Sequence, residues 1–182
     1  MPGILFDNKL GNMRLAADRI NRIAIEPGQI FSFWSTVGWP SRFRGYRRSR
    51  NLVNGKIQFA YGGGICQVAS ILYHLSLMAG LEIRERHNHS LDIYTEAERF
   101  TPLGADATVV YGYKDLRILN NTTHLICFEI SISGNEIAAQ LSSAGWIKAR
   151  TVIFERTEMP SKRRVVTLAD GVAVAESFYR IP

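Results

Sequence analysis

Apolar residues recur at three- and four-residue steps between residues 68 and 79, and this spacing predicts an amphipathic helix. Gly80 follows the last apolar position and is a typical C-terminal stop. A run of three glycines, residues 62–64, stands immediately before the predicted helix. Cys66 therefore lies where a glycine run gives way to the start of a helix. The apolar positions are Val68, Ile71, Leu72, Leu75, Met78 and Ala79.

The rest of the pattern predicts a chain of mixed α and β structure. Apolar positions at helical spacing indicate an earlier helix over about residues 10–23. Leu91, Ile93 and Tyr94 alternate with other residues, which predicts a strand with His89 near its beginning. We expect a core domain over residues 1–134 and a β-rich extension over residues 135–182, packed together as one globular unit. Short strands are expected in the extension at residues 137–141, 151–156, 164–168 and 172–179.

Length and composition agree with one compact unit of 182 residues, of which 46% are hydrophobic and 21% charged. At this length a domain buries on the order of 70% of the surface of its unfolded chain. The chain has no apolar run long enough to span a membrane, and residues 1–7 lack the features of a secretory signal. We therefore expect no transmembrane segment and a cytoplasmic protein as the chain is given. An envelope-associated protein is expected instead if the chain is part of a longer, anchored one.

The start of a helix makes Cys66 a candidate nucleophile. Free N–H groups and the positive end of the helix dipole favour an anion there, so the pKa of the Cys66 thiol is expected below its usual value of about 8.5. Gly63 and Gly64 ahead of it would let the backbone of a substrate come close. Cys127 lies in an apolar run over residues 125–130, where a buried structural thiol is expected. Cys66 is therefore the reactive candidate.

The candidate base is His89, which follows Cys66 by 23 residues. A helix that carries a cysteine is thus followed by a strand that carries a histidine. Papain-like thiol enzymes use this order, with an acid or amide on the next strand that orients the imidazole. The sequence therefore predicts an α+β fold with a papain-like or transglutaminase-like core, in which antiparallel strands follow the cysteine helix.

Two aspartates compete for the third position. If residues 91–94 and 108–113 form an antiparallel hairpin, opposing residue numbers sum to about 204, which places His89 opposite Asp115. Asp106 lies at the far end of such a hairpin. A bulge would change this register, so both aspartates stay candidates, with a preference for Asp115. Asn120 and Asn121 are weaker candidates.

The net charge of +6 is unevenly distributed along the chain. Arginines crowd residues 42–50, and Arg44 and Arg47 are candidates for binding a substrate carboxylate or another anion, because guanidinium groups bind such anions in a bidentate manner. No nucleic-acid motif accompanies them, which disfavours a nucleic-acid partner. Trp34 lies in an aromatic-rich segment over residues 27–39 and is a candidate for lining a pocket against the Cys66 helix.

Several motifs follow one another in order from about residue 12 to residue 134. They include Pro27-Gly28-Gln29-Ile30-Phe31-Ser32-Phe33, Gly62-Gly63-Gly64-Ile65-Cys66-Gln67, Glu85-Arg86, His89-Ser90, Asp106-Ala107-Thr108-Val109 and Asp115-Leu116. Together they resemble the VanW-like family. The resemblance implies a link to glycopeptide resistance and the cell wall, so a peptidoglycan-derived peptide or an anionic wall polymer is the expected partner. Gln67 and Ser90, which adjoin Cys66 and His89 in these motifs, are accordingly assigned to substrate binding. Members close to the resistance-cluster protein carry Gly in place of Asp106, which again favours Asp115.

Two classes of function follow from these observations. In a cysteine hydrolase or acyl transferase, Cys66 attacks an amide carbonyl of a stem peptide, His89 carries the proton, and one of the two aspartates orients the ring. In a non-catalytic binding module, the same loop and arginines hold a wall fragment or another anionic polymer without breaking a bond. Neither class needs a cofactor. A zinc site of Cys66, His87, His89 and an aspartate is a lesser alternative, since the sequence contains neither a CxxC nor an HExxH motif.

Overall fold

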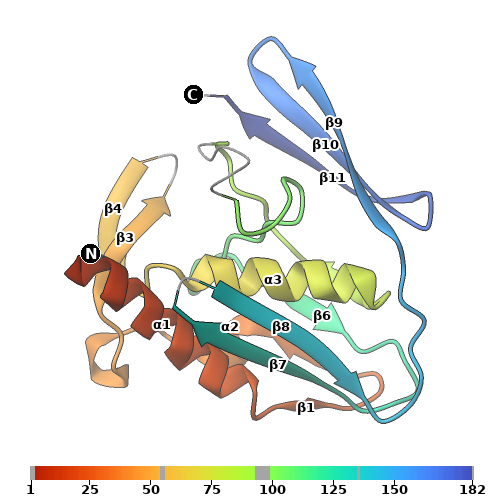
Figure 1. Cartoon of the computed structure of the whole chain (residues 1–182), viewed down its shortest axis with the longest axis horizontal. Helices are drawn as coiled ribbons and strands as arrows, with labels where there is room; N and C mark the ends of the chain where they lie inside the picture. The colour runs from red at the N-terminus through yellow and green to blue at the C-terminus, as the bar shows by residue number, and fades with distance from the viewer. Residues whose placement is uncertain (1–2, 54–55, 93–98, 135, 182) are drawn as a thin grey trace.

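The structure is a computed structural model that describes residues 3–53, 56–92, 99–134 and 136–181 (Figure 1). The helices are α1 (Ile4–Ile20), α2 (Phe33–Val37) and α3 (Ile65–Met78), with a short 3-10 helix, η1, at Arg42–Arg44. The strands are β1 (Ala24–Ile25), β2 (Ile30–Ser32), β3 (Arg48–Val53), β4 (Lys56–Tyr61), β5 (Glu82–Glu85), β6 (Arg117–Leu119), β7 (Ile126–Ser133), β8 (Glu136–Ser143), β9 (Val152–Met159), β10 (Lys162–Ala169) and β11 (Val172–Arg180). The chain is therefore α+β. Within the described ranges, no helix is both long enough and apolar enough to cross a membrane.

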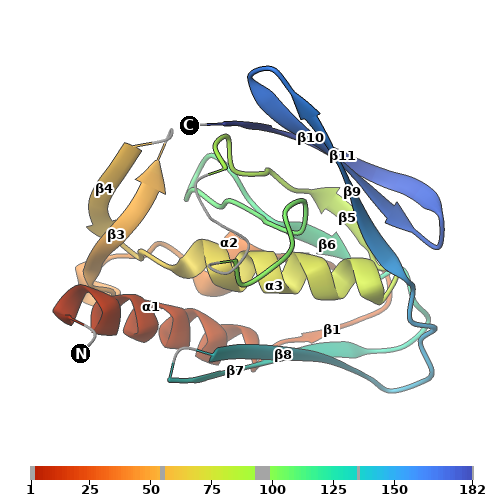
Figure 2. The same ribbon diagram turned by 45° about the horizontal axis from the view of Figure 1, so that its top comes forward.

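Helix α3 is the central element of the molecule (Figures 1 and 2). Helix α1 and the sheet of strand order β1-β7-β8 pack on one side of it, and the sheet of order β2-β6-β5 lies on the other. The hairpin of β3 and β4 leads directly into the glycine run before α3. These layers bury α3 and leave its N-terminal end beside the loops that follow β5.

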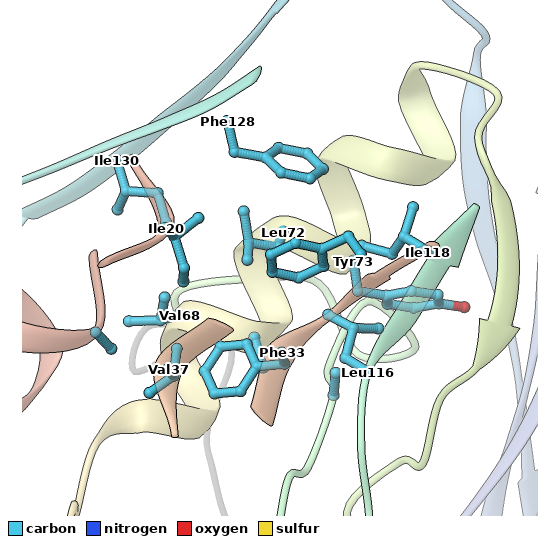
Figure 3. Close-up of a cluster of buried hydrophobic side chains, with 14 of the residues drawn as sticks. Ile20, Phe33, Val37, Val68, Leu72, Tyr73, Leu116, Ile118, Phe128 and Ile130 are labelled. Atoms are coloured by element: carbon cyan, nitrogen blue, oxygen red, sulfur yellow. The ribbon is translucent and has the colours of Figure 1, made fainter. Parts of the chain in front are cut away.

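The core forms around the apolar face of α3 (Figure 3). Val68 and Leu72 are fully buried among Ile20 of α1, Phe33 of α2 and Phe128 of β7. Each such side chain stabilises the fold by about 1.5–3 kcal/mol relative to an exposed position. The cysteine helix that the apolar spacing predicts is confirmed: it runs from Ile65 to Met78, and Gly80 follows in the left-handed region at φ 69°.

The hairpin expected from residues 91–94 and 108–113 is wrong in its second strand. Val110 bridges to Lys114, so the chain reverses within residues 110–114, at Gly112 with φ 75°. Thr108 lies instead beside His87, whose carbonyl accepts its N–H at 2.7 Å. Of the expected first strand, Leu91 forms an isolated parallel bridge with Arg180, and residues 93–98 lie outside the described residues.

The C-terminal part of the chain forms a separate antiparallel sheet of order β11-β10-β9. The boundary expected between residues 134 and 135 falls between β7 and β8, which pair from Ile126↔Ser143 to Ser133↔Glu136. Strand β8 therefore belongs to the sheet of β7, and the separate C-terminal sheet begins at Val152. Strand β11 of this sheet lies against the segment that follows β5, as Figure 2 shows.

Candidate functional site

The glycine run fixes Cys66 at the start of α3. Gly64 caps the helix with φ 96°, a left-handed conformation that glycine adopts without the steric cost of a Cβ. Its backbone is also packed against α1, because a Cβ at Gly64 would lie 2.6 Å from Cγ of Lys9 and 3.2 Å from Cγ of Met13. Gly63 is buried, and its carbonyl accepts a hydrogen bond from the Asn12 amide at 3.1 Å. The glycines thus dock the turn on α1 and place Cys66 in the first turn of the helix.

The Cys66 side chain is half-buried and faces the loop that follows Asp106. Its Sγ lies 3.7 Å from the carbonyl oxygen of Val109 and 3.9 Å from Oγ1 of Thr108. Ser70, one turn further along α3, ties this loop to the helix: its Oγ accepts the N–H of Ala107 at 2.9 Å and donates to the carbonyl of Cys66 at 2.8 Å. The helix and the loop are therefore held in a fixed relation.

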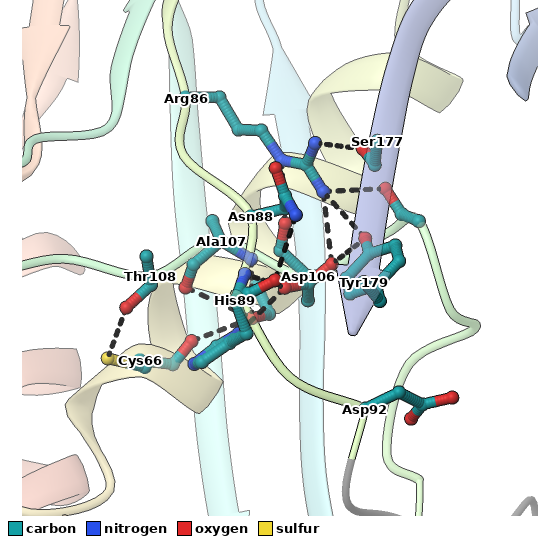
Figure 4. Close-up of polar contacts among 12 residues, drawn as sticks. Cys66, Arg86, Asn88, His89, Asp92, Asp106, Ala107, Thr108, Ser177 and Tyr179 are labelled. Atoms are coloured by element: carbon teal, nitrogen blue, oxygen red, sulfur yellow. Dashed lines mark hydrogen bonds and ion pairs between the residues drawn. The ribbon is translucent and has the colours of Figure 1, made fainter. Parts of the chain in front are cut away.

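His89 is held by Asp106. His89 makes two contacts with Asp106 Oδ2, both at 2.7 Å. One comes from the imidazole Nδ1 and the other from the backbone N–H of His89. Figure 4 shows the imidazole between Asp106 and Cys66. Because Nδ1 is engaged by the carboxylate, Nε2 is the ring nitrogen left for the Cys66 thiol.

The preference for Asp115 as the partner of His89 is wrong. Asp115 accepts hydrogen bonds from Ser32 Oγ at 2.5 Å and from the backbone N–H of Trp34 at 3.0 Å, and so stabilises the start of α2. The tight loop at residues 110–114 is the reason, since it carries Asp115 away before the chain reaches β6 and leaves Asp106 beside His89. Asn120, a weaker candidate, makes its contacts elsewhere: it is buried, and its side-chain amide donates to the carbonyls of Ile25 and His124.

Arg86 holds the far side of the Asp106 carboxylate (Figure 4). Its side chain is 8% exposed, and Nη2 contacts Asp106 Oδ1 at 3.0 Å while Nε donates to the Asp106 carbonyl at 2.7 Å. The guanidinium also lies 4.8 Å from the centroid of the Tyr73 ring. From β11, the hydroxyl of Tyr179 donates to Asp106 Oδ1 at 2.5 Å, and Ser177 Oγ accepts from Arg86 at 2.5 Å.

The charges of these groups reinforce one another. Burial raises the pKa of the Cys66 thiol, but the interaction with His89, together with the contacts to Val109 and Thr108, outweighs burial and holds that pKa below its usual value. Burial lowers the pKa of His89, but the hydrogen bond to Asp106 and the interaction with Cys66 raise it to about 10. Burial raises the pKa of Asp106, but His89 and then Arg86 lower it to about 2. The arrangement therefore favours the charged form of each of the three groups relative to its usual titration.

The start of α3 also offers a site for a developing oxyanion. Cys66 is the second residue of the helix, a position where a backbone N–H has no carbonyl one turn back to bind. The positive end of the helix dipole acts at the same place. A carbonyl carbon attacked by Sγ would thus have a helix N–H within reach of its oxygen.

The other expected substrate-binding residues are dispersed. Arg44 is exposed and donates to the carbonyl of Val37 at 3.3 Å, and Arg47 is exposed with its backbone bonded to Asn12 and Gly62. Their polar contacts therefore fix the loop between α2 and β3. Gln67 is half-buried in the first turn of α3. Ser90 is exposed, and its carbonyl accepts the N–H of Arg180 at 3.0 Å.

Trp34 lines a surface cavity of about 460 Å³. Its ring packs edge to face against Tyr111, 5.5 Å between centroids, and its Nε1 donates to the Lys114 carbonyl at 2.8 Å. The cavity is also lined by Glu85 and by Tyr113, which is 79% exposed. Val109, whose carbonyl contacts Sγ, precedes the 110–114 loop that lines the cavity, but neither Val109 nor Cys66 is among the lining residues.

A zinc site is not formed by the residues that the sequence suggests. His87 contacts Glu85 Oε1 at 3.0 Å, and His89 is engaged by Asp106. Among the described residues, no group of three or more His, Cys, Asp or Glu side chains is placed to hold a metal ion.

The sequence assigned no role to Arg86, Ser177 or Tyr179, although Arg86 stands in one of the motifs that carry the family resemblance. Arg86 follows β5 directly, where an arginine is usually exposed, and no local pattern indicates that it is buried. Tyr179 lies 73 residues from its partner Asp106, in a strand whose apolar alternation reports only that one face is buried. A contact between them becomes visible only when the C-terminal sheet is in place.

Comparison with known proteins identifies relatives that cover most of this chain. The family described as VanW like protein matches residues 8–142. The vancomycin B-type resistance protein VanW of Enterococcus faecalis (strain ATCC 700802 / V583) is 31% identical over 135 residues, 74% of this chain and 49% of that protein. The uncharacterized protein YoaR of Bacillus subtilis (strain 168) is 34% identical over 139 residues, 76% of this chain and 44% of that protein.

The chain thus spans about half the length of these two relatives. No solved structure matches it, so the kinship to papain-like or transglutaminase-like cores stays a prediction. The family match contains Cys66, His89 and Asp106 and ends before β9. On the extent of this match and the identity of its relatives, the chain belongs to the VanW-like protein family.

Proposed function

We propose that this protein is a cysteine-dependent acyl-transfer enzyme in which Cys66 is the nucleophile. The observation that carries the proposal is the position of the His89 imidazole, which is bound to Asp106 through Nδ1 and lies between Asp106 and Cys66 (Figure 4). A cysteine at a helix start, a histidine and an orienting acid follow one another along the chain in the order used by papain-like thiol enzymes. A relation to that fold is part of the proposal.

The proposed reaction has two steps. In the first, the Cys66 thiolate attacks the carbonyl carbon of an amide, a C–S bond forms, and the C–N bond breaks as His89 gives its Nε2 proton to the leaving amine. In the second, water or another amine attacks the thioester, His89 takes a proton from it, and the C–S bond breaks. Water as the acceptor gives hydrolysis, and an amine gives transfer.

The substrate class is inferred from the relatives and from the cavity lined by Trp34 and the 110–114 loop. One relative is named for resistance to vancomycin, and we infer that a stem peptide of peptidoglycan is the acyl donor. The cavity lined by Trp34, Tyr111 and Tyr113 gives apolar contact, while Glu85 and Lys114 at its edge give charges of both signs. This combination suits a peptide that carries both amino and carboxylate groups. Such a peptide would be met at the cell envelope.

The test is the conversion of purified stem-peptide fragments, with product masses determined by liquid chromatography and mass spectrometry. The wild-type protein is expected to cut an amide bond in the presence of water alone, or to exchange the amine when a second peptide is added. Cys66→Ala is expected to abolish both reactions, and Cys127→Ala, which removes the other thiol, is the matched control and is expected to retain them. Binding of the fragments by wild type and Cys66→Ala alike, with no change in any mass, would instead support a binding module.

A further inference from the structure

Strand β11 contributes two side chains to the site although it lies outside the family match. Tyr179 donates its hydroxyl to Asp106 Oδ1 at 2.5 Å, and Ser177 accepts a hydrogen bond from Arg86 at 2.5 Å (Figure 4). Both side chains belong to a strand that starts at Val172, thirty residues beyond the end of the match at residue 142. Both residues are buried, each with 1% of its surface exposed.

The segment that carries His89 is attached to the same strand. The side-chain amide of Asn88 donates to the Phe178 carbonyl at 2.9 Å. The backbone N–H of Arg180 donates to the Ser90 carbonyl and the backbone N–H of Asp92 donates to the Arg180 carbonyl, both at 3.0 Å. These hydrogen bonds therefore hold the residues on both sides of His89 along β11.

Ionic and apolar contacts reinforce this attachment. The Asp92 side chain is 1% exposed and is ion-paired with Arg163 of β10. Tyr179 is buried with Leu103 and Val165, and Gly104 fits between Val165 and Phe154, where a Cβ would lie 2.7 Å from each. The C-terminal sheet is thus packed on both the segment around His89 and the loop before Asp106.

We propose that β11 is part of the active site, with Tyr179 and Ser177 as positioning residues that orient the Asp106 carboxylate toward His89. Tyr179 and Arg86 occupy Oδ1, which leaves Oδ2 for the two contacts with His89. Ser177 in turn fixes the guanidinium that binds Oδ1. The inference rests on the proposed function for the role of Cys66, but the contacts of Asp106 stand without it.

The effect of Tyr179 on the thiol follows from the charges around Asp106. A hydroxyl donated to Oδ1 stabilises the carboxylate, and an ionised carboxylate stabilises the His89 imidazolium, which in turn stabilises the thiolate. Burial and then the nearby Asp106 charge raise the pKa of Tyr179, so the phenol keeps its proton and stays a donor. The titratable groups that face Asp106 are His89 and Arg86 from the segment after β5, Tyr73 from α3 and Tyr179 from β11.

The experiment measures the alkylation rate of Cys66 by iodoacetamide against pH, resolved by peptide mass spectrometry. Tyr179→Phe removes only the hydroxyl, and it is expected to lower the rate at pH 7 about three- to tenfold and to move the midpoint of the profile to higher pH. Ser177→Ala acts through Arg86 and is expected to shift the profile in the same direction by less. Tyr46→Phe is the matched control, because Tyr46 is a buried tyrosine whose hydroxyl has no hydrogen-bond partner among the described residues.

Thermal unfolding of each variant separates positioning from a loss of folding. A shifted profile in Tyr179→Phe, with an unfolding temperature near that of Tyr46→Phe, supports the inference. A wild-type profile in both Tyr179→Phe and Ser177→Ala overturns it and leaves the proposed function intact. A wild-type midpoint at or above the usual thiol value of about 8.5 overturns the proposed function itself. If Tyr179→Phe does not fold, Ser177→Ala decides.

Discussion

The Asp106 carboxylate accepts hydrogen bonds from His89, Arg86 and Tyr179. Arg86 and His89 lie in the segment after β5, and Tyr179 lies in β11. Such a carboxylate is held in one orientation and keeps its charge at neutral pH. Asp115 offers a useful contrast, because it is a carboxylate of the same kind that accepts hydrogen bonds at the start of α2. Substitutions at the two aspartates therefore distinguish a role in orienting His89, at Asp106, from a role in stabilising the fold, at Asp115.

Replacing Asp106 by Asn is expected to reduce turnover of a stem-peptide substrate by about 10²–10⁴-fold, because the imidazolium loses its counter-charge and the ring loses its fixed orientation. Asp115→Asn is the matched control. It is expected to cost about 1 kcal/mol of unfolding free energy through the weakened start of α2 while leaving the rate per folded molecule near wild type. Steady-state kinetics and urea unfolding of both variants test this. Equal loss of turnover in the two variants would contradict the assignment of Asp106.

At the scale of elements, the site depends on how the turn before α3 docks on α1. Gly64 has a positive φ and lies in close contact with Lys9 and Met13. Gly11, within α1, has open space where a Cβ would lie. The same substitution therefore has opposite expected effects at two glycines of neighbouring elements.

Gly64→Ala is expected to lower the free energy of unfolding by about 1–3 kcal/mol, because alanine is strained at this φ and its Cβ would displace α1. Gly11→Ala is expected to raise it by about 0.5–1 kcal/mol, because alanine favours the helix. Chemical denaturation of the two variants and the wild type measures both effects. A Gly64→Ala protein as stable as Gly11→Ala would show that the turn is not constrained as the structure describes.

The cysteine helix was predictable from sequence because its apolar residues repeat at helical spacing and glycines mark both ends. The register between His89 and the aspartates was not, because the single glycine at 112 turns the chain within residues 110–114 and transfers the pairing from Asp115 to Asp106. Local patterns also carry no information on Arg86 and Tyr179, which are 93 residues apart and meet only in the folded molecule.

At the scale of the whole molecule, His89 and Asp106 link stability to pH. The pKa of His89 is raised to about 10 despite its burial, so the imidazolium stabilises the fold fully below about pH 6.5, and this stabilisation is lost as the pH rises through about 10. The pKa of Asp106 is lowered to about 2 despite its burial, so its contribution is present above about pH 3.8 and is lost as the pH falls through about 2. The pair therefore contributes most between about pH 4 and 6.5.

His89→Gln removes the titrating group and is expected to destabilise the protein by about 2 kcal/mol near pH 6, with the difference from wild type shrinking toward pH 10. Urea unfolding of both proteins across pH 5–10 measures this difference. Cys127→Ala is the control for a substitution away from the site, because its difference in unfolding free energy from wild type should not follow this pH profile. A difference for His89→Gln that is constant from pH 5 to pH 10 would contradict the ion pair.

The proposed mechanism requires Cys66 to form a covalent bond to the acyl group of its substrate. It is tested most directly by mixing the protein with a stem-peptide fragment, quenching in acid at short times and measuring the intact mass, followed by digestion to locate any adduct. We expect a thioester on Cys66 whose mass equals the acyl part of the peptide, present in Cys127→Ala and absent in Cys66→Ala. Turnover of the same peptide at an undiminished rate by Cys66→Ala would contradict it.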